Sequence, residues 1–166
     1  MFKQPKIAEL SLKIIDKLNE NDIRCTILTK GCYPKELGSR NGQSTRNEYG
    51  ITLVSLDEDF RKEFEPNSAP FKDRIKSLKN LSIKGFKTWV SMEPYPTPNL
   101  IKQDLLRILD AVSFVNKIIF GRLNYSVKSS EFKYTKEFYN SQALSVIKFC
   151  KKNRIDYHIK EGTQIN

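Results

Sequence analysis

Residues 86–98, FKTWVSMEPYPTP, constrain the fold of this 166-residue chain more than any other stretch. The first seven residues are mostly aromatic, β-branched or apolar, which is typical of a strand, and Glu93 follows directly. Prolines at positions 94, 96 and 98 exclude a helix and the interior of a strand. The strand is therefore predicted to end at a carboxylate.

A helix is predicted behind this stretch, because apolar side chains over residues 100–112 recur at helical spacing. Pro98 and Asn99 supply its start. The result is a βα unit whose strand end presents Ser91 and Glu93, and ligands bind at such strand ends in α/β sheets and barrels. The residues leave one alternative open, in which Glu93 is a solvated loop residue beside a proline-stiffened turn.

Length and composition favour a single globular domain over residues 1–166. A chain of this size can bury a substantial core, and 39% hydrophobic with 29% charged residues is ordinary for a globular protein. No run approaches the roughly 18 apolar residues of a membrane helix. The first residues, MFKQPK, lack the apolar core of a signal peptide. We therefore expect a cytoplasmic protein without a membrane partner.

Cysteines and charge say little about partners. Cys25, Cys32 and Cys150 form no CxxC or CxxxCxxC cluster, so the sequence predicts neither a disulfide framework nor a complete thiolate metal site. The formal net charge of +10 raises affinity for polyanions. The lysines are spread along the whole chain, however, so the positive charge is also explained by solvent-exposed faces of helices.

Helical and strand patterns alternate along the chain. Helices are expected over residues 7–18, 71–84, 99–112 and 135–152, with a short helix or turn over 57–64. Strands are expected over residues 24–29, 51–56, 86–92, 116–120 and 155–159. Residues 31–50 hold four glycines and show no apolar period, so they predict a long loop, and residues 126–134 predict a shorter polar one.

Five strands separated by helical segments, without hairpin signals, predict an α/β fold with a parallel sheet and right-handed crossovers. A complete eightfold barrel needs about 250 residues, so the sheet should be an open, partial β/α barrel of about five βα units. The carboxyl ends of its strands share one edge. The polar residues expected at that edge are Lys30, Ser55, Glu93, Arg122, Asn124 and Lys160.

Short motifs recur along the chain in an order that resembles a known family. They are Thr29-Lys30-Gly31 at a strand end, Thr52-Leu53 with Ser55, the Phe64-Glu65-Pro66 turn before Asp73-Arg74-Ile75, Lys84-Gly85, residues 88–94 (TWVSMEP), residues 121–125 (GRLNY) and residues 157–160 (YHIK). Each motif alone is weakly specific. Together they resemble the later part of radical S-adenosylmethionine proteins of the spore photoproduct lyase-like (DNA repair photolyase) group.

The resemblance also points to a missing part. Members of that family bind a 4Fe–4S iron–sulfur cluster through a CxxxCxxC loop in a partial TIM barrel, and this chain has no such loop. On the resemblance it corresponds to the C-terminal part of a larger protein and should be inactive alone. The strand at residues 24–29, from Arg24 to Thr29, would then be an uncovered edge. An upstream cluster-bearing half or a second copy of the chain would cover it.

The resemblance implies S-adenosylmethionine as cofactor and assigns roles to strand-end residues. Lys30 and Ser55 would contact the amino-acid end of S-adenosylmethionine, where an ammonium meets the ligand carboxylate. The adenosine or substrate side would be lined by Glu93, Arg122 and Asn124, with Ser91 and Lys160 as substrate-side candidates. The residues themselves leave open a solvated lysine at position 30 and a strand hydroxyl bonded to backbone at position 55.

Two functional interpretations follow. The resemblance implies part of a lyase-like radical enzyme, with nucleic acid as one candidate substrate. Its full-length relatives reduce the sulfonium at the cluster and abstract hydrogen with a 5′-deoxyadenosyl radical, while the protein orients the substrate. The alternative is a non-catalytic, basic nucleic-acid-binding module that uses the arginine-bearing loop of residues 31–50. Tyr33 and Tyr49 would then stack on bases, although the residues leave open that both are ordinary packing residues.

Glu93 carries the sharpest geometric prediction. Alternate residues of a strand point to the same side, so Ser91 and Glu93 should both face the inside of the partial barrel. Lys30, Arg122 and Lys160 would surround the carboxylate and keep it ionised, with Lys30 within roughly 15 Å. This geometry fits a ligand contact and a purely structural ion pair equally well.

Overall fold

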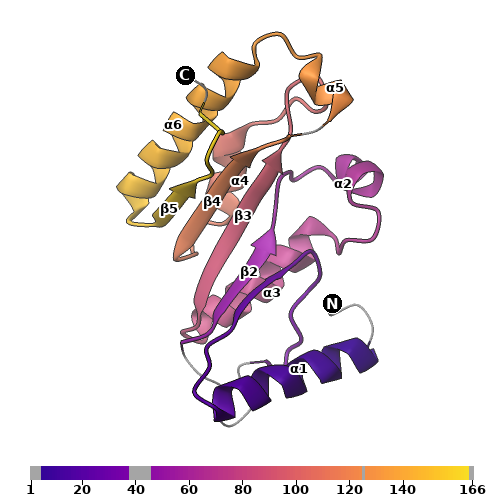
Figure 1. Ribbon diagram of the computed structural model, residues 1–166, viewed down its shortest axis with the longest axis vertical. Helices are drawn as coiled ribbons and strands as arrows, with labels where there is room; N and C mark the ends of the chain where they lie inside the picture. The colour runs from indigo at the N-terminus through magenta and orange to yellow at the C-terminus, as the bar shows by residue number, and fades with distance from the viewer. Residues whose placement is uncertain (1–4, 38–45, 125, 165–166) are drawn as a thin grey trace. The chain divides into compact units, whose positions relative to one another are not determined.

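A computed structural model describes residues 5–37, 46–124 and 126–164 of the chain (Figure 1). In this part of the chain, five parallel strands form one open sheet in the sequence order β1-β2-β3-β4-β5. The arrangement confirms the predicted α/β fold and is consistent with a partial β/α barrel. β1 and β5 form the two edges of the sheet.

Strands and helices follow one another closely along the chain. The strands are β1 (Thr26–Thr29), β2 (Glu48–Thr52), β3 (Lys87–Tyr95), β4 (Lys117–Arg122) and β5 (Asp156–Ile159). The helices are α1 (Pro5–Glu20), α2 (Glu58–Phe64), α3 (Phe71–Ile83), α4 (Leu105–Ala111), α5 (Val127–Ser130) and α6 (Thr135–Asn153). The short helix α5 lies where a polar loop was predicted. Among the described residues, no helix is long and apolar enough to cross a lipid bilayer.

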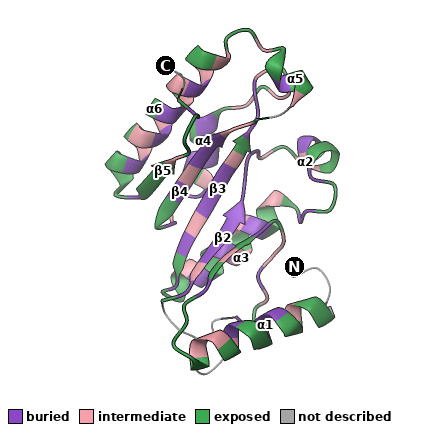
Figure 2. Cartoon of the chain, viewed as in Figure 1, coloured by how far each residue is buried: buried purple, intermediate pink, exposed green. Residues whose placement is uncertain are grey.

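The elements belong to two compact units. The first comprises Met1–Thr52 and Asp57–Trp89, and the second comprises Leu53–Leu56 and Val90–Asn166. The boundary between them falls just after β2 and again within β3. Each unit has buried residues on its strands and on the helix faces that cover them (Figure 2).

The first unit is built on β1, β2 and α3. β1 and β2 pair in parallel, starting with Thr26 opposite Glu48, and α3 packs on β2. Three buried rings meet edge to face, with centroids 5.5 Å apart for Tyr33 and Tyr49 and 5.4 Å apart for Tyr49 and Phe86. Edge-to-face contact suits the quadrupoles of these rings and adds to the free energy of burial.

Gly50 explains why β2 begins earlier than predicted. A Cβ at this position would lie 2.3 Å from Cε2 of Trp89, so only glycine lets the indole approach the strand. The carbonyl oxygen of Gly50 accepts a hydrogen bond of 2.6 Å from the Tyr33 hydroxyl. The predicted strand over residues 51–56 and the predicted loop through residue 50 were therefore wrong at their common boundary, because this glycine serves packing instead of a turn.

Helix α1 confirms the predicted helix but buries only part of its apolar face. Leu12 and Ile15 are buried, whereas Ile7, Leu10 and Ile14 are exposed. The exposed residues recur at helical spacing, so they form a continuous apolar stripe on the surface of the first unit.

The second unit is built on β4, β5 and α6. β4 and β5 pair in parallel, starting with Lys117 opposite Asp156, and α6 packs on both strands and on α4. The ring of Tyr95 lies 5.1 Å from that of Phe120 and 6.3 Å from that of Phe138. These contacts anchor the carboxyl end of β3 in the core of this unit.

Tyr139 in α6 joins the ends of two strands. Its hydroxyl donates to the carbonyl oxygen of Tyr95 at 2.7 Å and accepts from the backbone N–H of Leu123 at 3.0 Å. Burial raises the pKa of this phenol, because the ionised form would lose its hydration. The buried face of α6 includes Tyr139 and Ala143, whereas Leu144 is exposed.

The strand β3 is longer than the sequence predicted. It continues through Glu93 and Pro94 to Tyr95, and the peptide bond between Glu93 and Pro94 is cis. The prediction that the strand ends before Glu93 was therefore wrong, since a proline can occupy a strand where its missing N–H is not needed.

Helix α4 begins later than the sequence predicted. Asp104 precedes it, and a side-chain oxygen of Asp104 accepts a hydrogen bond of 2.9 Å from the N–H of Leu106. Such an N-terminal cap satisfies a backbone donor that the helix itself leaves unpaired. The predicted start at Pro98 and Asn99 was wrong, because the N–H of Leu100 bonds to the carbonyl of Thr97 in a turn.

Candidate functional site

The carboxyl end of β1 carries a cluster of three charged side chains, Lys30, Glu65 and Arg74, called here the Lys30 cluster. Nζ of Lys30 lies 2.9 Å from one carboxylate oxygen of Glu65, and Nη1 of Arg74 lies 2.9 Å from the other. Nη1 of Arg74 also donates to the carbonyl oxygen of Thr52 at 2.8 Å. The cluster therefore links the ends of β1 and β2 through a single carboxylate.

Burial differs sharply within the Lys30 cluster. The side chains of Glu65 and Arg74 are 6% and 2% exposed, whereas that of Lys30 is 48% exposed. A buried charge is costly unless it is paired, so Glu65 and Arg74 stabilise each other. Two cations share one anion, which leaves a surplus of one positive charge. That surplus is accessible only at the ammonium of Lys30.

Backbone bonds fix the segments that carry this cluster. The N–H of Ala69 donates to the carbonyl oxygen of Lys30 at 2.8 Å. The hydroxyl of Ser68 donates to the carbonyl oxygen of Glu65 at 2.8 Å, and the Thr29 hydroxyl accepts from the N–H of Gly31 at 2.9 Å. The turn behind α2 is thus tied to the end of β1, and this preorganises the ion pair.

A second group of polar residues lies at the carboxyl ends of β3, β4 and β5, in the second unit. Oε2 of Glu93 lies 3.6 Å from Nζ of Lys160, and both side chains are partly exposed. A Cβ at Gly121 would lie 2.8 Å from Cδ of Glu93, so the carboxylate rests directly on the backbone of β4. Gly121 therefore decides where the Glu93 side chain lies.

Arg122 is the last residue of β4 and is only partly paired. Its Nε is buried and has no hydrogen-bond partner among the described residues. Its backbone N–H lies 3.4 Å from the hydroxyl oxygen of Thr163, a buried residue just beyond β5. Asn124 follows β4 and is exposed. A buried donor without a partner is unusual and suits a polar ligand at this strand end.

The two serines are both buried. Ser91 lies within β3, and its carbonyl oxygen accepts the N–H of Leu53 at 2.9 Å. Ser55 lies three residues beyond the end of β2, in the second unit. Ser91 was predicted at the end of its strand, but β3 continues four residues beyond it. The ligand contacts predicted for both serines stay predictions.

Lys30, Ser55, Arg122, Asn124 and Lys160 lie at or just beyond a strand end, whereas Ser91 and Glu93 lie within β3, and the structure groups the residues differently from the sequence prediction. Lys30 pairs with Glu65, for which sequence reasoning gave no role. Glu93 has Lys160 as a cationic neighbour, as predicted, and the described residues include no ion pair between Glu93 and Arg122. The proximity of Glu93 to Lys30 stays a prediction.

Sequence reasoning missed the importance of Arg74, although a signal was present. Arg74 lies in the first turn of α3, and Leu78 and Leu81 follow at spacings of four and seven residues. A charged residue on such an apolar stripe must be buried with a partner, and a nearby carboxylate such as Glu65 is the natural one.

A metal site is not evident in the part of the chain that the structure describes. No group of three or more His, Cys, Asp or Glu side chains there could hold a metal ion. Cys25 and Cys150 are buried, and Cys32 is partly exposed. The three cysteines therefore form no thiolate cluster among the described residues.

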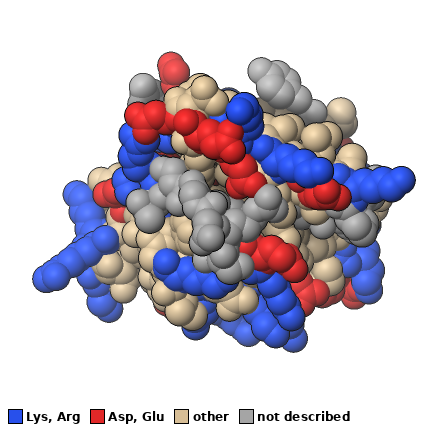
Figure 3. Space-filling view, turned by 90° about the horizontal axis from the view of Figure 1, so that it is seen from below, with Lys and Arg blue, Asp and Glu red and all other residues tan. Residues whose placement is uncertain are grey.

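The features predicted for nucleic-acid binding were a basic surface, an arginine-bearing loop and two tyrosines. On the face seen in Figure 3, side chains of Lys and Arg are exposed together with those of Asp and Glu. Tyr33 and Tyr49 are 5% and 0% exposed, so the prediction that their rings stack on bases was wrong. Both rings pack in the core of the first unit instead. Part of the arginine-bearing loop, residues 38–45, lies outside the described residues.

Comparisons with known proteins bear on the fold. No protein-family model and no curated protein matches the sequence. A domain of pyruvate-formate lyase-activating enzyme from Bacteroides vulgatus ATCC 8482 matches with a TM-score of 0.66 at 14% identity, over 92% of this chain and 91% of that chain. Streptococcus suis SuiB bound to S-adenosylmethionine matches with a TM-score of 0.61 at 17% identity, over 89% of this chain and 34% of SuiB. The three chains share a fold. This chain spans about a third of SuiB.

Proposed function

We propose that this chain is the S-adenosylmethionine- and substrate-binding part of a radical S-adenosylmethionine enzyme. Two observations support the proposal: the fold it shares with SuiB, which was solved with S-adenosylmethionine bound, and the surplus positive charge at a strand end. The finer assignment to the spore photoproduct lyase-like group, and to nucleic acid as substrate, rests on the sequence motifs alone.

The Lys30 cluster is the observation that carries the proposal. S-adenosylmethionine ends in an amino acid, and its carboxylate needs a cation at the mouth of the site. Lys30 has three N–H donors and its ammonium is half exposed, so it can bind a second carboxylate while it keeps Glu65. Glu65 and Arg74 hold Lys30 in position. The other residues predicted to contact the ligand or the substrate belong to the second unit and stay predictions; they are Ser55, Glu93, Arg122, Asn124, Ser91 and Lys160.

The described residues fit S-adenosylmethionine but do not fit an iron–sulfur cluster. In a radical enzyme the cluster supplies the electron that cleaves the sulfonium. The ligands it needs are several convergent thiolates, and the described residues offer no such group. We therefore expect this chain to act with a cluster-bearing part.

The edge strand β1 is where that part would bind. β1 lies at one end of the sheet order, and its Leu28 is exposed. The apolar stripe of α1, formed by Ile7, Leu10 and Ile14, is exposed in the same unit. An unpaired strand edge with exposed apolar residues binds another strand readily. An upstream cluster-bearing half or a second copy of the chain would cover it.

Calorimetric titration with S-adenosylmethionine tests the proposal. We expect weak binding by the unmodified chain and a loss of about tenfold in Lys30→Gln, since one charge-assisted contact is worth about 1.5 kcal/mol. Arg74 keeps its partner in this variant, so the fold should persist. Lys62→Gln is the control, because Lys62 is exposed on α2 and its change in charge is identical. Absence of binding at millimolar ligand, or equal loss in both variants, would contradict the proposal.

A further inference from the structure

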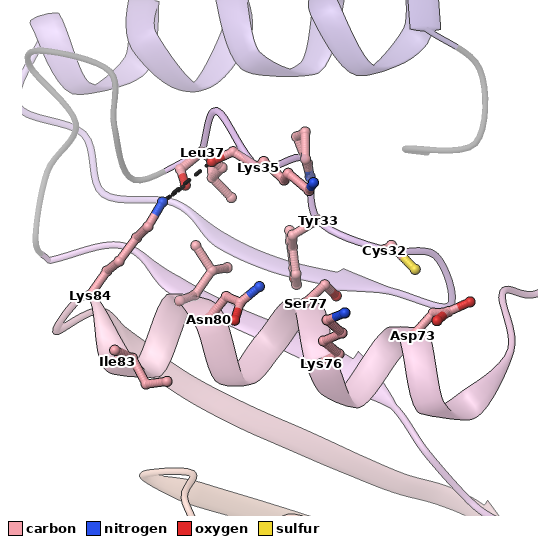
Figure 4. Close-up of a pocket in the computed structure, with 12 residues that line it drawn as sticks. Cys32, Tyr33, Lys35, Leu37, Asp73, Lys76, Ser77, Asn80, Ile83 and Lys84 are labelled. Carbon is pink, nitrogen blue, oxygen red and sulfur yellow. Dashed lines mark hydrogen bonds between the residues drawn. The ribbon is translucent and has the colours of Figure 1, made fainter.

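We propose that a groove in the first unit binds a small anion with an apolar body. The groove runs between residues 32–37, which follow β1, and helix α3 (Figure 4). Its volume of about 520 Å³ lies within the range of small-molecule sites. None of the side chains of the Lys30 cluster lines it. Binding in the groove is therefore independent of S-adenosylmethionine binding at the Lys30 cluster.

The apolar wall of the groove is rigid. Tyr33, Leu37 and Leu81 line it and are buried. The Tyr33 hydroxyl bonds to the carbonyl oxygens of Ile27 and Gly50, at 3.2 and 2.6 Å, so the ring is held against the strands. A wall fixed by the core needs little reordering when a ligand binds, and this favours affinity.

One end of the groove is closed by Lys84, just beyond α3. Nζ of Lys84 donates to the carbonyl oxygens of Lys35 and Leu37, at 3.3 and 3.4 Å, and Figure 4 shows these bonds reaching across from the helix to the facing segment. The two walls are thereby tied together. The positive charge of Lys84 stays at this end, because its partners are neutral carbonyls.

Charge in the groove favours an anion. Lys35, Lys76 and Lys84 line it, against the single carboxylate of Asp73. Neither Lys35 nor Lys76 has an ion-pair partner among the described residues. Asn80 lies one turn beyond Lys76 on α3, so an ammonium and an amide face the same space. These groups suit a carboxylate, sulfonate or phosphate oxygen.

The position of Asp73 orients the ligand. Asp73 lies near Cys32, at the end of the groove opposite Lys84 (Figure 4). Burial, followed by the negative charge of Asp73, raises the pKa of the Cys32 thiol. An anionic group would therefore bind on the side of the groove away from Asp73, between Lys76 on α3 and Lys35 on the facing segment, with its apolar body along Tyr33.

Cys32 provides a reporter inside the groove. Cys25 and Cys150 are buried, whereas Cys32 is partly exposed, so iodoacetamide should alkylate Cys32 first. The probe is 8-anilinonaphthalene-1-sulfonate, which combines an aromatic body with one anionic group. We expect it to slow alkylation of Cys32 at pH 9 in a saturable manner, as followed by peptide mass spectrometry.

Charge variants give the decisive comparison. Lys35→Gln with Lys76→Gln should weaken protection of Cys32 by about tenfold or more, since each lost contact is worth about 1.5 kcal/mol. Lys76→Gln alone should show part of this loss. Lys79→Gln is the control, because Lys79 is exposed on the same helix and does not line the groove. The uncharged analogue N-phenyl-1-naphthylamine should protect Cys32 at least about tenfold less well.

Three results would overturn the proposal. The first is probe binding, seen by fluorescence, that leaves Cys32 alkylation unchanged. The second is an equal loss of protection in the Lys79→Gln control, and the third is equal protection by the charged and uncharged probes. Because all three lysines are exposed, the variants should keep the circular dichroism spectrum of the unmodified chain.

Discussion

Among single residues, we expect substitution of Glu65 to cause the largest loss in the free energy of unfolding. Glu65→Gln would leave the guanidinium of Arg74 buried without its carboxylate, and breaking such a pair costs about 3–5 kcal/mol. Urea denaturation measures this loss in the free energy of unfolding. Glu63→Gln, an exposed position in α2, should change it by less than about 0.5 kcal/mol. Equal stabilities of the two variants would show that the pair contributes little.

Gly121 tests how Glu93 is positioned. In Gly121→Ala the new methyl group would lie 2.8 Å from Cδ of Glu93, so the carboxylate must move and its contact with Lys160 weakens. We expect a loss of about 1–3 kcal/mol in the free energy of unfolding, as for other overpacked sites. The matched comparison is the same change in a Glu93→Ala background, where the collision is absent. If Gly121→Ala lowered the free energy of unfolding equally in that background, the collision with Glu93 would not be the cause of the loss.

At the scale of elements, the buried face of α6 should make stability depend on pH. Cys150 lies on this face, and burial raises the pKa of its thiol from 9.0 to about 11. Above pH 9 the unfolded chain releases this proton while the folded chain retains it. Stability should therefore fall as pH rises from about 9 toward 11, by up to about 1.4 kcal/mol per pH unit.

The measurement for Cys150 is urea denaturation at pH 8 and pH 10 with a reductant present. Other groups titrate in this range, so the difference between unmodified chain and Cys150→Ala isolates the thiol. We expect Cys150→Ala to lose less stability between the two pH values. Identical losses would mean that burial does not protect the thiol from ionisation.

At the scale of the whole molecule, we expect the chain alone to be catalytically inactive. Anaerobic treatment with iron and sulfide should give neither a 4Fe–4S absorption band nor reductive cleavage of S-adenosylmethionine, because the described residues offer no convergent ligands. A related enzyme with its own CxxxCxxC loop serves as the positive control. A stable cluster with cleavage activity would refute this expectation.

The net charge of +10 gives a second prediction for the whole molecule. Oligonucleotides should bind weakly, and the affinity should fall steeply between 50 and 200 mM salt, as counterion release requires. Tyr33→Phe should not alter it, because the ring is buried. Salt-dependent binding that clearly prefers single strands to duplexes would instead favour the nucleic-acid-binding module. No binding at low salt, or binding without salt dependence, would remove that alternative.

Local pattern was enough to predict the fold class. Each strand has a run of β-branched, aromatic or apolar residues, and each long helix has an apolar period, because these features follow from the geometry of one element. The placement of Lys30, Arg122 and Lys160 at strand ends followed for the same reason. The predicted ends of strands were wrong where the tertiary structure, not the local sequence, decides the role of a residue. Gly50 is typical of a loop in the sequence, but in the structure it makes room for Trp89. Pro94 is typical of the end of a strand, but β3 continues through it.

The amino-acid sequence by itself determined that this protein alternates strands with helices and has polar residues at strand ends. Only the tertiary structure decided which of those residues meet. Lys30 and Glu65 are 35 positions apart, and Glu93 and Gly121 are 28 apart, so no local propensity could pair them. Their contacts depend on parallel strands that bring distant segments together, and on burial, which makes an unpaired charge such as Arg74 costly.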